Sequence, residues 1–233
     1  MNEKKSFKIE WFDALSSTND YAKNKRTEKQ NLIVVASSQT GGRGTKGRSF
    51  SSEIGGVYLT KLTFHENMPV CRAFEIMSNA AVSVCKTLQA FGVQPKIKWP
   101  NDIFVNDKKI CGILIENVFS GKYVSSSVVG IGVNVYNQLP SDLQDIATTL
   151  MQQTGKKYSV RDVAEKLIEE LQLSHTMEEY LSFVGYMGGA ATLLIGERSY
   201  QATLCSVDKE GGLWAIVDGQ KKRFTATEIS VRF

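Results

Sequence analysis

The chain has 233 residues, 42% of them hydrophobic, which is enough for one large domain or for one domain with a small appendage. Its net charge of +4 is too small to indicate nucleic-acid binding, and no apolar run is long enough to span a membrane. The N-terminus has no signal-peptide pattern, and four cysteines without a C-x-x-C pair suit a reducing compartment, so we expect a cytoplasmic protein.

In the first half of the chain, strands are predicted at 6–15, 31–39 and 57–64. Ser17 and its hydroxyl-bearing neighbours offer capping side chains to a polar helix between the first two strands. The segment 69–91 predicts a long helix, with Pro69 in its first turn and Gly92 as its stop.

The second half begins with strand patterns from 96 to 136, followed by a second long helix at 159–184, capped by Ser159. Beyond residue 186, short strands separated by glycine turns predict a small β-barrel. We therefore predict two domains, 1–186 and 187–233. The fold class is α+β, a mixed β-sheet with packed helices, because strands and helices do not alternate regularly.

The loop GGRGTKGRS at 41–49 carries three cations and no acid, and it comes close to two phosphate-binding patterns, G-x-G-x-x-G and the P-loop. Both patterns require a helix directly after the loop, whereas a strand is predicted here, and Arg48 stands where the P-loop has lysine. Two interpretations stay open: a solvated loop, or a mobile clamp that folds over a polyphosphate when the ligand arrives.

Two further clusters accompany the loop. Lys96 and Lys98 are expected to share one face of a strand, where a lysine is commonly just solvated. Glycines inside strand patterns are typical either of bulges or of a close approach to the backbone. These glycines are Gly112, Gly130 and Gly132.

Five motifs in this order resemble those of the biotin protein ligase family, the biotin–[acetyl-CoA-carboxylase] ligases. They are S-T-N at 17–19, Q-x-x-G-R-G-x-x-G-R at 39–48, K-W-P-N-D at 98–102, K-x-x-G-I-L-x-E at 109–116 and G-x-G-x-N at 130–134. The resemblance implies a class II synthetase-like catalytic domain and a small C-terminal SH3-like barrel. Only 16 residues precede Ser17, so we expect the monofunctional type, without an N-terminal DNA-binding domain and without DNA binding.

The resemblance also implies the chemistry. Such a ligase joins the carboxylate of biotin to the α-phosphate of ATP, releases pyrophosphate, and then transfers biotin to a lysine of a biotin carboxyl carrier protein. Two anions must meet in the first step, so cations are required, with Mg²⁺ shielding the triphosphate. The resemblance assigns no side chains to the Mg²⁺. A homodimer and a monomer both fit the sequence.

Site residues follow from the motifs. Lys98, Arg43 and Arg48 are the implied catalytic cations, Lys98 at the carboxylate and α-phosphate and the arginines on phosphate oxygens. The biotin side is implied to hold Ser17, Thr18, Asn19, Gln39, Gly42, Arg43, Lys98, Gly112 and Gly130. The nucleotide side is implied to hold Arg43, Gly44, Thr45, Lys46, Arg48, Phe50, Asn101 and Asn134.

The sequence departs from the family pattern at two positions. Thr45 stands where many members carry arginine, which predicts weaker retention of the biotinyl-adenylate. Phe50 stands where tryptophan is common, and it keeps an aromatic face for stacking.

Two rival functions are a lipoate–protein ligase of the same fold, whose R-R-x-S-G-G-G signature is absent here, and a non-catalytic biotin sensor. We also expect Cys71, Cys85 and Cys111 to be buried free thiols. His175 is expected at the surface, and the two histidines predict no zinc site.

Overall fold

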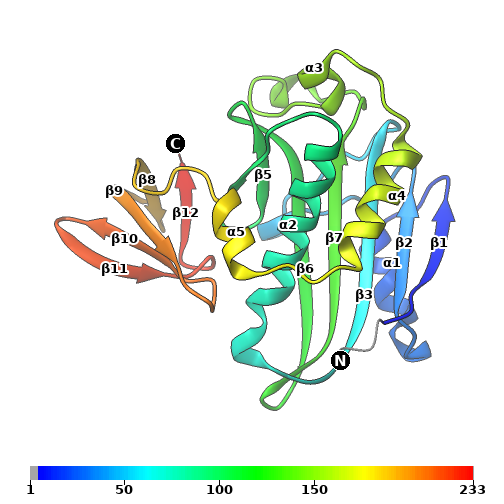
Figure 1. Ribbon diagram of the computed structural model, residues 1–233, viewed down its shortest axis with the longest axis horizontal. Coiled ribbons are helices and arrows are strands. Elements are labelled where there is room, and N and C mark those ends of the chain that lie inside the picture. The colour runs from blue at the N-terminus through cyan, green and yellow to red at the C-terminus, as the bar shows by residue number, and fades with distance from the viewer. Residues whose placement is uncertain (1–4, 233) are drawn as a thin grey trace.

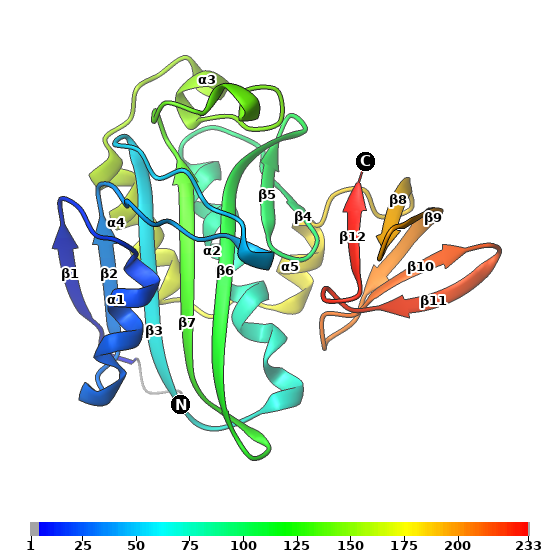
Figure 2. The same cartoon turned by 180° about the vertical axis from the view of Figure 1, so that it is seen from behind.

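The computed structural model describes residues 5–232, apart from the side chain of Lys46. Two β-sheets lie beside each other, and the larger one has the strand order β1-β2-β3-β7-β6-β5-β4 (Figures 1 and 2). Its strands are β1 (Lys8–Phe12), β2 (Leu32–Ala36), β3 (Gly56–Pro69), β4 (Lys96–Lys98), β5 (Asp102–Val105), β6 (Lys108–Ser120) and β7 (Tyr123–Asn134). Strand β1 runs parallel to β2, and the other neighbouring pairs are antiparallel, so the sheet is mixed as predicted.

Helices cover the two faces of this sheet unequally. They are α1 (Thr18–Asn24), α2 (Phe74–Ala90), α3 (Leu150–Thr154), α4 (Val160–Leu171) and α5 (Met177–Phe183). Helices α2, α4 and α5 lie on one face, whereas α1 and the chain between β2 and β3 lie on the other (Figures 1 and 2). No helix within residues 5–232 is both long and apolar enough to cross a membrane.

The second sheet is antiparallel and has the order β11-β10-β9-β8-β12. Its strands are β8 (Ala190–Ile195), β9 (Arg198–Val207), β10 (Leu213–Val217), β11 (Gln220–Phe224) and β12 (Ile229–Arg232). The predicted boundary after residue 186 falls between α5 and β8. Buried apolar side chains of both sheets, such as Ile97 and Leu213, belong to one continuous core. Over residues 5–232 the strand order is an open one, so closure into a barrel stays a prediction.

The first long helix is shorter than predicted. Helix α2 begins at Phe74, because β3 continues past a bulge until Pro69 pairs with Tyr123 of β7. The residues between them form a 3-10 turn, Val70–Arg72, which places Cys71 at the surface. The expectation of a buried thiol is therefore wrong for Cys71 and confirmed for Cys85 and Cys111.

The second long helix is broken into α4 and α5. Ser159 caps α4 as predicted, and a capping box of Thr176 and Glu179 starts α5. His175 precedes this box, and its side chain is only 2% exposed, with Nδ1 3.8 Å from a Glu179 oxygen. The predicted surface position of His175 is wrong, because the break turns its ring inward. Helix α3, held by a capping box of Thr149 and Gln152, was not predicted.

His65 makes an acid-sensitive contribution to stability. Its Nε2 lies 2.8 Å from Ser127 Oγ, and burial, together with the charges of Lys5 and Lys61, lowers its pKa to about 4. The unfolded chain therefore binds a proton more readily than the folded one below pH about 6.5, and the loss is complete below about 4. We expect wild type to lose about 1–2 kcal/mol more than His65→Gln across this window, after allowing for partial exposure.

Urea unfolding of both proteins at pH 7.5, 5.5 and 4.5 measures this difference. Glutamine keeps a polar partner for Ser127 but does not titrate, so it is the matched control. Parallel loss of stability in both proteins would contradict the assignment to His65.

Candidate active site

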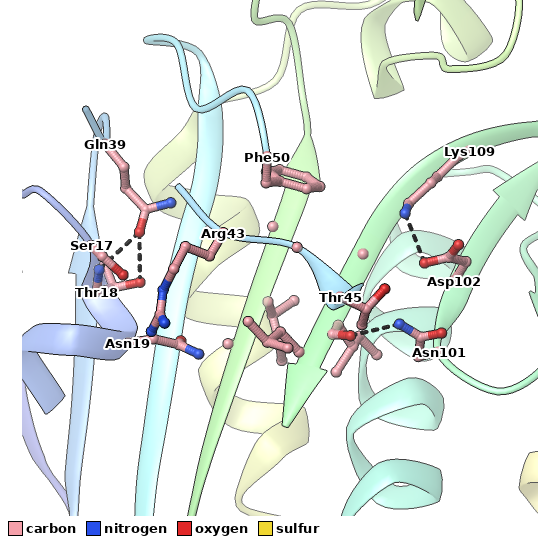
Figure 3. Close-up of a pocket in the computed structure, with 17 residues that line it drawn as sticks. Ser17, Thr18, Asn19, Gln39, Arg43, Thr45, Phe50, Asn101, Asp102 and Lys109 are labelled. Carbon is pink, nitrogen blue, oxygen red and sulfur yellow. Dashed lines mark hydrogen bonds and ion pairs between the residues drawn. The ribbon is translucent and has the colours of Figure 1, made fainter. Parts of the chain in front are cut away.

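A pocket lies on the sheet face that carries α1, beneath the glycine-rich loop. Its floor is formed by β6 and β7, where Gly112 and Gly132 stand directly opposite each other. Figure 3 shows Ser17, Thr18 and Gln39 at one end and Asp102 and Lys109 at the other. Of the predicted site residues, the structure brings eleven into this lining: Ser17, Thr18, Asn19, Gln39, Arg43, Gly44, Thr45, Phe50, Asn101, Gly112 and Gly130.

The polar end of the pocket is a connected hydrogen-bond cluster. Gln39 Oε1 accepts from the backbone N–H of Thr18 at 2.8 Å and from its hydroxyl at 3.0 Å. Gln39 Nε2 donates to Ser52 Oγ at 2.9 Å, and the Ser17 hydroxyl caps α1 by accepting from the N–H of Asp20. Ser17 and Thr18 are buried, so a ligand reaching this end meets preoriented donors and acceptors.

Asn19 extends the cluster across the sheet. Its Oδ1 accepts from Thr60 Oγ1 at 2.7 Å and its Nδ2 donates to Glu116 at 3.1 Å. A Cβ on Gly130 would stand 2.8 Å from Asn19 Cγ, which is too close for contact. The space directly above Gly130 is therefore filled by the amide of Asn19, and a part of Gly130 in biotin binding stays a prediction.

The glycine-rich loop folds as a small hairpin over the pocket. The N–H of Phe50 donates to Gly42 O at 2.9 Å and the N–H of Gly44 to Arg48 O at 2.7 Å, with a 3-10 turn, Thr45–Gly47, at the tip. Gly42 itself packs inside the hairpin, because a Cβ there would stand 2.5 Å from Ser52 Oγ. The loop is followed by strand β3, so it opens no helix, as predicted.

Phe50 covers the glycine floor from the loop side. A Cβ on Gly132 would stand 2.7 Å from Phe50 Cζ, and one on Gly112 would stand 3.2 Å from Phe50 Cε2. The two glycines thus let an aromatic ring approach the sheet closely. In Figure 3 the ring lies between the polar end and the charged end of the pocket.

Arg43 bridges the loop to the sheet. Its Nη2 lies 2.6 Å from Asp20 and 3.4 Å from Glu116. Burial alone would raise the pKa of Glu116, but hydrogen bonds from Lys23 and Asn19 and the charge of Arg43 hold that pKa below its ordinary value. Arg43 is therefore held by two carboxylates at a place where an incoming anion would compete for it.

The charged end of the pocket is centred on Asp102. Lys109 Nζ lies 2.7 Å from Asp102 Oδ1, and Lys98 stands directly opposite Asp102 in the pairing of β4 with β5. Burial lowers the pKa of Lys98, Asp102 opposes this, and the charges of Lys109 and Arg232 add to the lowering. Lys98, Lys109 and Arg232 thus gather near one carboxylate, and Arg232 comes from the C-terminal sheet.

Five predicted residues fall outside the pocket lining. Arg48 is exposed on the loop, Gly42 is packed in the hairpin, and Lys98 stands beside the charged end. The side chain of Lys46 lies outside the described part of the structure. Asn134 is buried at the end of β7, on the same face of the strand as Gly130 and Gly132, and it donates to Thr148 O at 3.1 Å and accepts from Asn137 Nδ2 at 3.1 Å. These bonds fix the end of β7, and the nucleotide-side role of Asn134 stays a prediction.

A sequence profile of the Biotin/lipoate A/B protein ligase family matches residues 11–134, more than half of the chain. The chain belongs to this family. The bifunctional ligase/repressor BirA of Bacillus subtilis is 37% identical over 166 residues, which cover 68% of this chain and 50% of that protein. BirA of Escherichia coli is 27% identical over 232 residues, which cover 94% of this chain and 72% of that protein. The chain spans about half the length of the first curated relatives that it matches.

Solved structures agree with this family membership. The biotin protein ligase from Aquifex aeolicus in complex with biotin and ATP matches with a TM-score of 0.77 at 28% identity, covering 96% of this chain and 98% of that one. The Leishmania major biotin protein ligase in complex with biotinyl-5-AMP matches with a TM-score of 0.61 at 26% identity. The match covers 94% of this chain and 98% of that one. The predicted fold, that of a biotin protein ligase catalytic domain, is confirmed.

Several side chains at the site were not among the predicted site residues. Asp102 and Lys109 were inside the quoted motifs, and their nearness to Lys98 follows once β4, β5 and β6 are paired. Glu116 shares a face of β6 with Gly112, a signal that alternation along the strand contained. Nothing in the sequence indicated Asp20, because its partner Arg43 lies on a loop.

Proposed function

We propose that this protein is a biotin–protein ligase that forms biotinyl-5'-AMP and transfers biotin to a carrier lysine. The observation that carries the proposal is the difference between the two ends of the pocket, one lined by neutral polar groups and the other by charged groups. Neutral hydrogen-bonding groups around Gln39 and Thr18 suit a ureido ring, and the cations around Asp102 suit a carboxylate meeting a triphosphate. The names of the matched ligases, which include a biotin–[acetyl-CoA-carboxylase] ligase of Paracoccus denitrificans at 35% identity over 105 residues, support it.

The first step joins two anions. A carboxylate oxygen of biotin attacks the α-phosphorus of ATP, and the bond from that phosphorus to the bridging oxygen breaks, so pyrophosphate leaves with the electron pair. Lys98 and Lys109 would offset the negative charge that accumulates at the α-phosphate, and Arg43 would leave Asp20 for a phosphate oxygen. Ordering of the loop on binding stays a prediction.

The second step consumes the mixed anhydride. The amine of the carrier lysine attacks the acyl carbon, AMP leaves, and the amine loses a proton. The carrier is proposed to be the biotin carboxyl carrier part of acetyl-CoA carboxylase. A cytoplasmic location and the lack of DNA binding stay predictions from the sequence, which fits both a monomer and a homodimer.

ATP would arrive with Mg²⁺ bound to its phosphates. The described residues hold no group of three or more His, Cys, Asp or Glu side chains that could coordinate a metal. Asp102 is the carboxylate that lines the pocket, and it is paired with Lys109, so triphosphate oxygens would supply most ligands of the ion. The ion would shield the triphosphate, while the lysines act at the reacting phosphate.

ATP–pyrophosphate exchange, with biotin and with lipoate offered separately, tests the proposal. We expect exchange with biotin alone. The family description covers both acids, so exchange with lipoate alone would move the function to a lipoate–protein ligase. No exchange with either, by folded protein that still binds biotin, would indicate a sensor.

Because Thr45 stands where many family members carry arginine, we expect the enzyme to release biotinyl-5'-AMP more readily. Thr45 is exposed on the loop and lines the pocket, where an arginine would add one charge-assisted hydrogen bond. We expect Thr45→Arg to slow release of biotinyl-5'-AMP by about 10- to 100-fold, since such a bond contributes roughly 1.5–3 kcal/mol. Release of labelled intermediate after rapid dilution measures this. Thr40→Arg is the control, because it adds the same charge to an exposed position outside the pocket lining, and equal slowing in both variants would refute the role of Thr45.

A further inference from the structure

The segment that follows Lys98 is fixed where the two sheets meet. The Trp99 side chain is 5% exposed, and its Nε1 donates to the carbonyl of Gly211 in the C-terminal sheet at 3.0 Å. The carbonyl of Pro100 accepts from the Tyr180 hydroxyl at 3.2 Å. Since Lys98 directly precedes these residues in a three-residue edge strand, its place depends on what holds Trp99.

Gly211 belongs to the turn between β9 and β10, and Asp208 organises this turn. Asp208 Oδ1 accepts from the N–H groups of Glu210 at 3.1 Å and Gly212 at 2.9 Å. Its Oδ2 accepts from Trp214 Nε1 at 3.0 Å, and Arg223 donates to both oxygens at 2.6 and 3.1 Å. The Asp208 carboxylate thus accepts five hydrogen bonds, and these hold the backbone of the turn from Asp208 to Gly212 in one conformation.

Gly211 packs against α2 of the larger domain. Its φ of +84° favours glycine, and a Cβ there would stand 2.6 Å from Phe74 Cε2 at the start of α2. The turn therefore packs closely against Phe74, and in this conformation its carbonyl accepts from Trp99. A change in the turn displaces the acceptor of Trp99.

We propose that Asp208 is a positioning residue for Lys98, acting through the carbonyl of Gly211 and the indole of Trp99. The inference rests on the proposed function, because that function gives Lys98 its task at the α-phosphate. The C-terminal sheet thereby contributes to adenylation from a distance, by holding the end of β4. Lys98 is the group that contacts the reacting atoms.

Two variants break the chain of contacts from Asp208 to Lys98 at different points. Asp208→Asn removes the charge that gathers the five donors, and Trp99→Phe removes only the N–H that meets Gly211 while keeping a buried ring. The matched control is Asp218→Asn, the same substitution at the exposed β10–β11 turn of the same sheet, where φ is +52° and asparagine is well tolerated. Biotin-dependent ATP–pyrophosphate exchange and amide hydrogen exchange over residues 97–102 are measured on each full-length protein.

We expect Asp208→Asn and Trp99→Phe each to lower the maximal exchange rate by about 10- to 100-fold, because a displacement near 1 Å costs this much. The KM for biotin should stay within about twofold, since the groups proposed to hold its ureido ring lie at the opposite end of the pocket. Both variants should accelerate amide exchange at 97–102, and the double variant should be no slower than either single one. Asp218→Asn should match wild type.

Wild-type turnover in Asp208→Asn, or unchanged amide exchange at 97–102, would overturn the proposal. A rise in the KM for biotin equal to the fall in rate would also overturn it, because that pattern indicates general loss of structure. A wild-type protein without pyrophosphate exchange would overturn the proposed function instead, and amide exchange would still decide whether Asp208 holds Trp99.

Discussion

Lys98→Ala should lower biotin-dependent pyrophosphate exchange by about 100- to 1,000-fold, the loss that follows removal of one group that stabilises transition-state charge. Lys98 lies at the end of β4, half-buried beside Asp102, Lys109 and Arg232, at the charged end of the pocket. The remaining cations would still attract the triphosphate, so the KM for ATP should change less than the maximal rate. Initial rates at varied ATP separate the two effects.

Lys96→Ala is the control for this variant. Lys96 stands two residues earlier on the same face of β4, is exposed, and lines no part of the pocket. Both variants should unfold at nearly the same urea concentration as wild type, because exposed or half-buried lysines at an edge strand contribute little to the core. Activity of Lys98→Ala within about tenfold of wild type would reject Lys98 as a catalytic residue.

Gly130→Ala should destabilise the fold by about 2–3 kcal/mol, through loss of the two hydrogen bonds made by the buried Asn19 amide. The added methyl would displace Asn19, which is 5% exposed and bonded at both ends, to Thr60 and to Glu116. Displacement breaks both bonds of the buried Asn19 amide, whereas Thr60 keeps Thr18 as a partner and Glu116 keeps Lys23 and Arg43. Urea unfolding, followed by tryptophan fluorescence, measures the change.

The same substitution in an Asn19→Ala background tests the cause. With the amide gone, the methyl of Gly130→Ala enters free space, so its additional cost should fall below about 1 kcal/mol. An equal cost in both backgrounds would show that the strand itself, and not Asn19, requires glycine at this position. Biotin affinity of the two Gly130→Ala proteins then shows whether the position also matters for ligand binding.

Much of the fold followed from local pattern. The strands of both sheets and the cap at Ser159 were predicted because alternation, β-branched runs and capping side chains act over a few residues. The start of α2 was misplaced because Pro69 suits a helix's first turn, yet a long-range pairing with Tyr123 kept it in β3. The break before Thr176 was missed because the apolar periodicity continues across it.

Local pattern and tertiary structure also contributed differently to the candidate site. The sequence by itself determined which segments carry the chemistry, since motifs such as 39–48 and 98–102 are contiguous, and their order indicated the family. Only the tertiary structure decided which side chains meet: that Arg43 lies on Asp20 and Glu116, that Asn19 fills the space above Gly130, and that Asp208 reaches Trp99 through Gly211. The physical reason is that these contacts join residues 23 to 112 positions apart, and such pairings depend on strand order, which local sequence pattern does not encode.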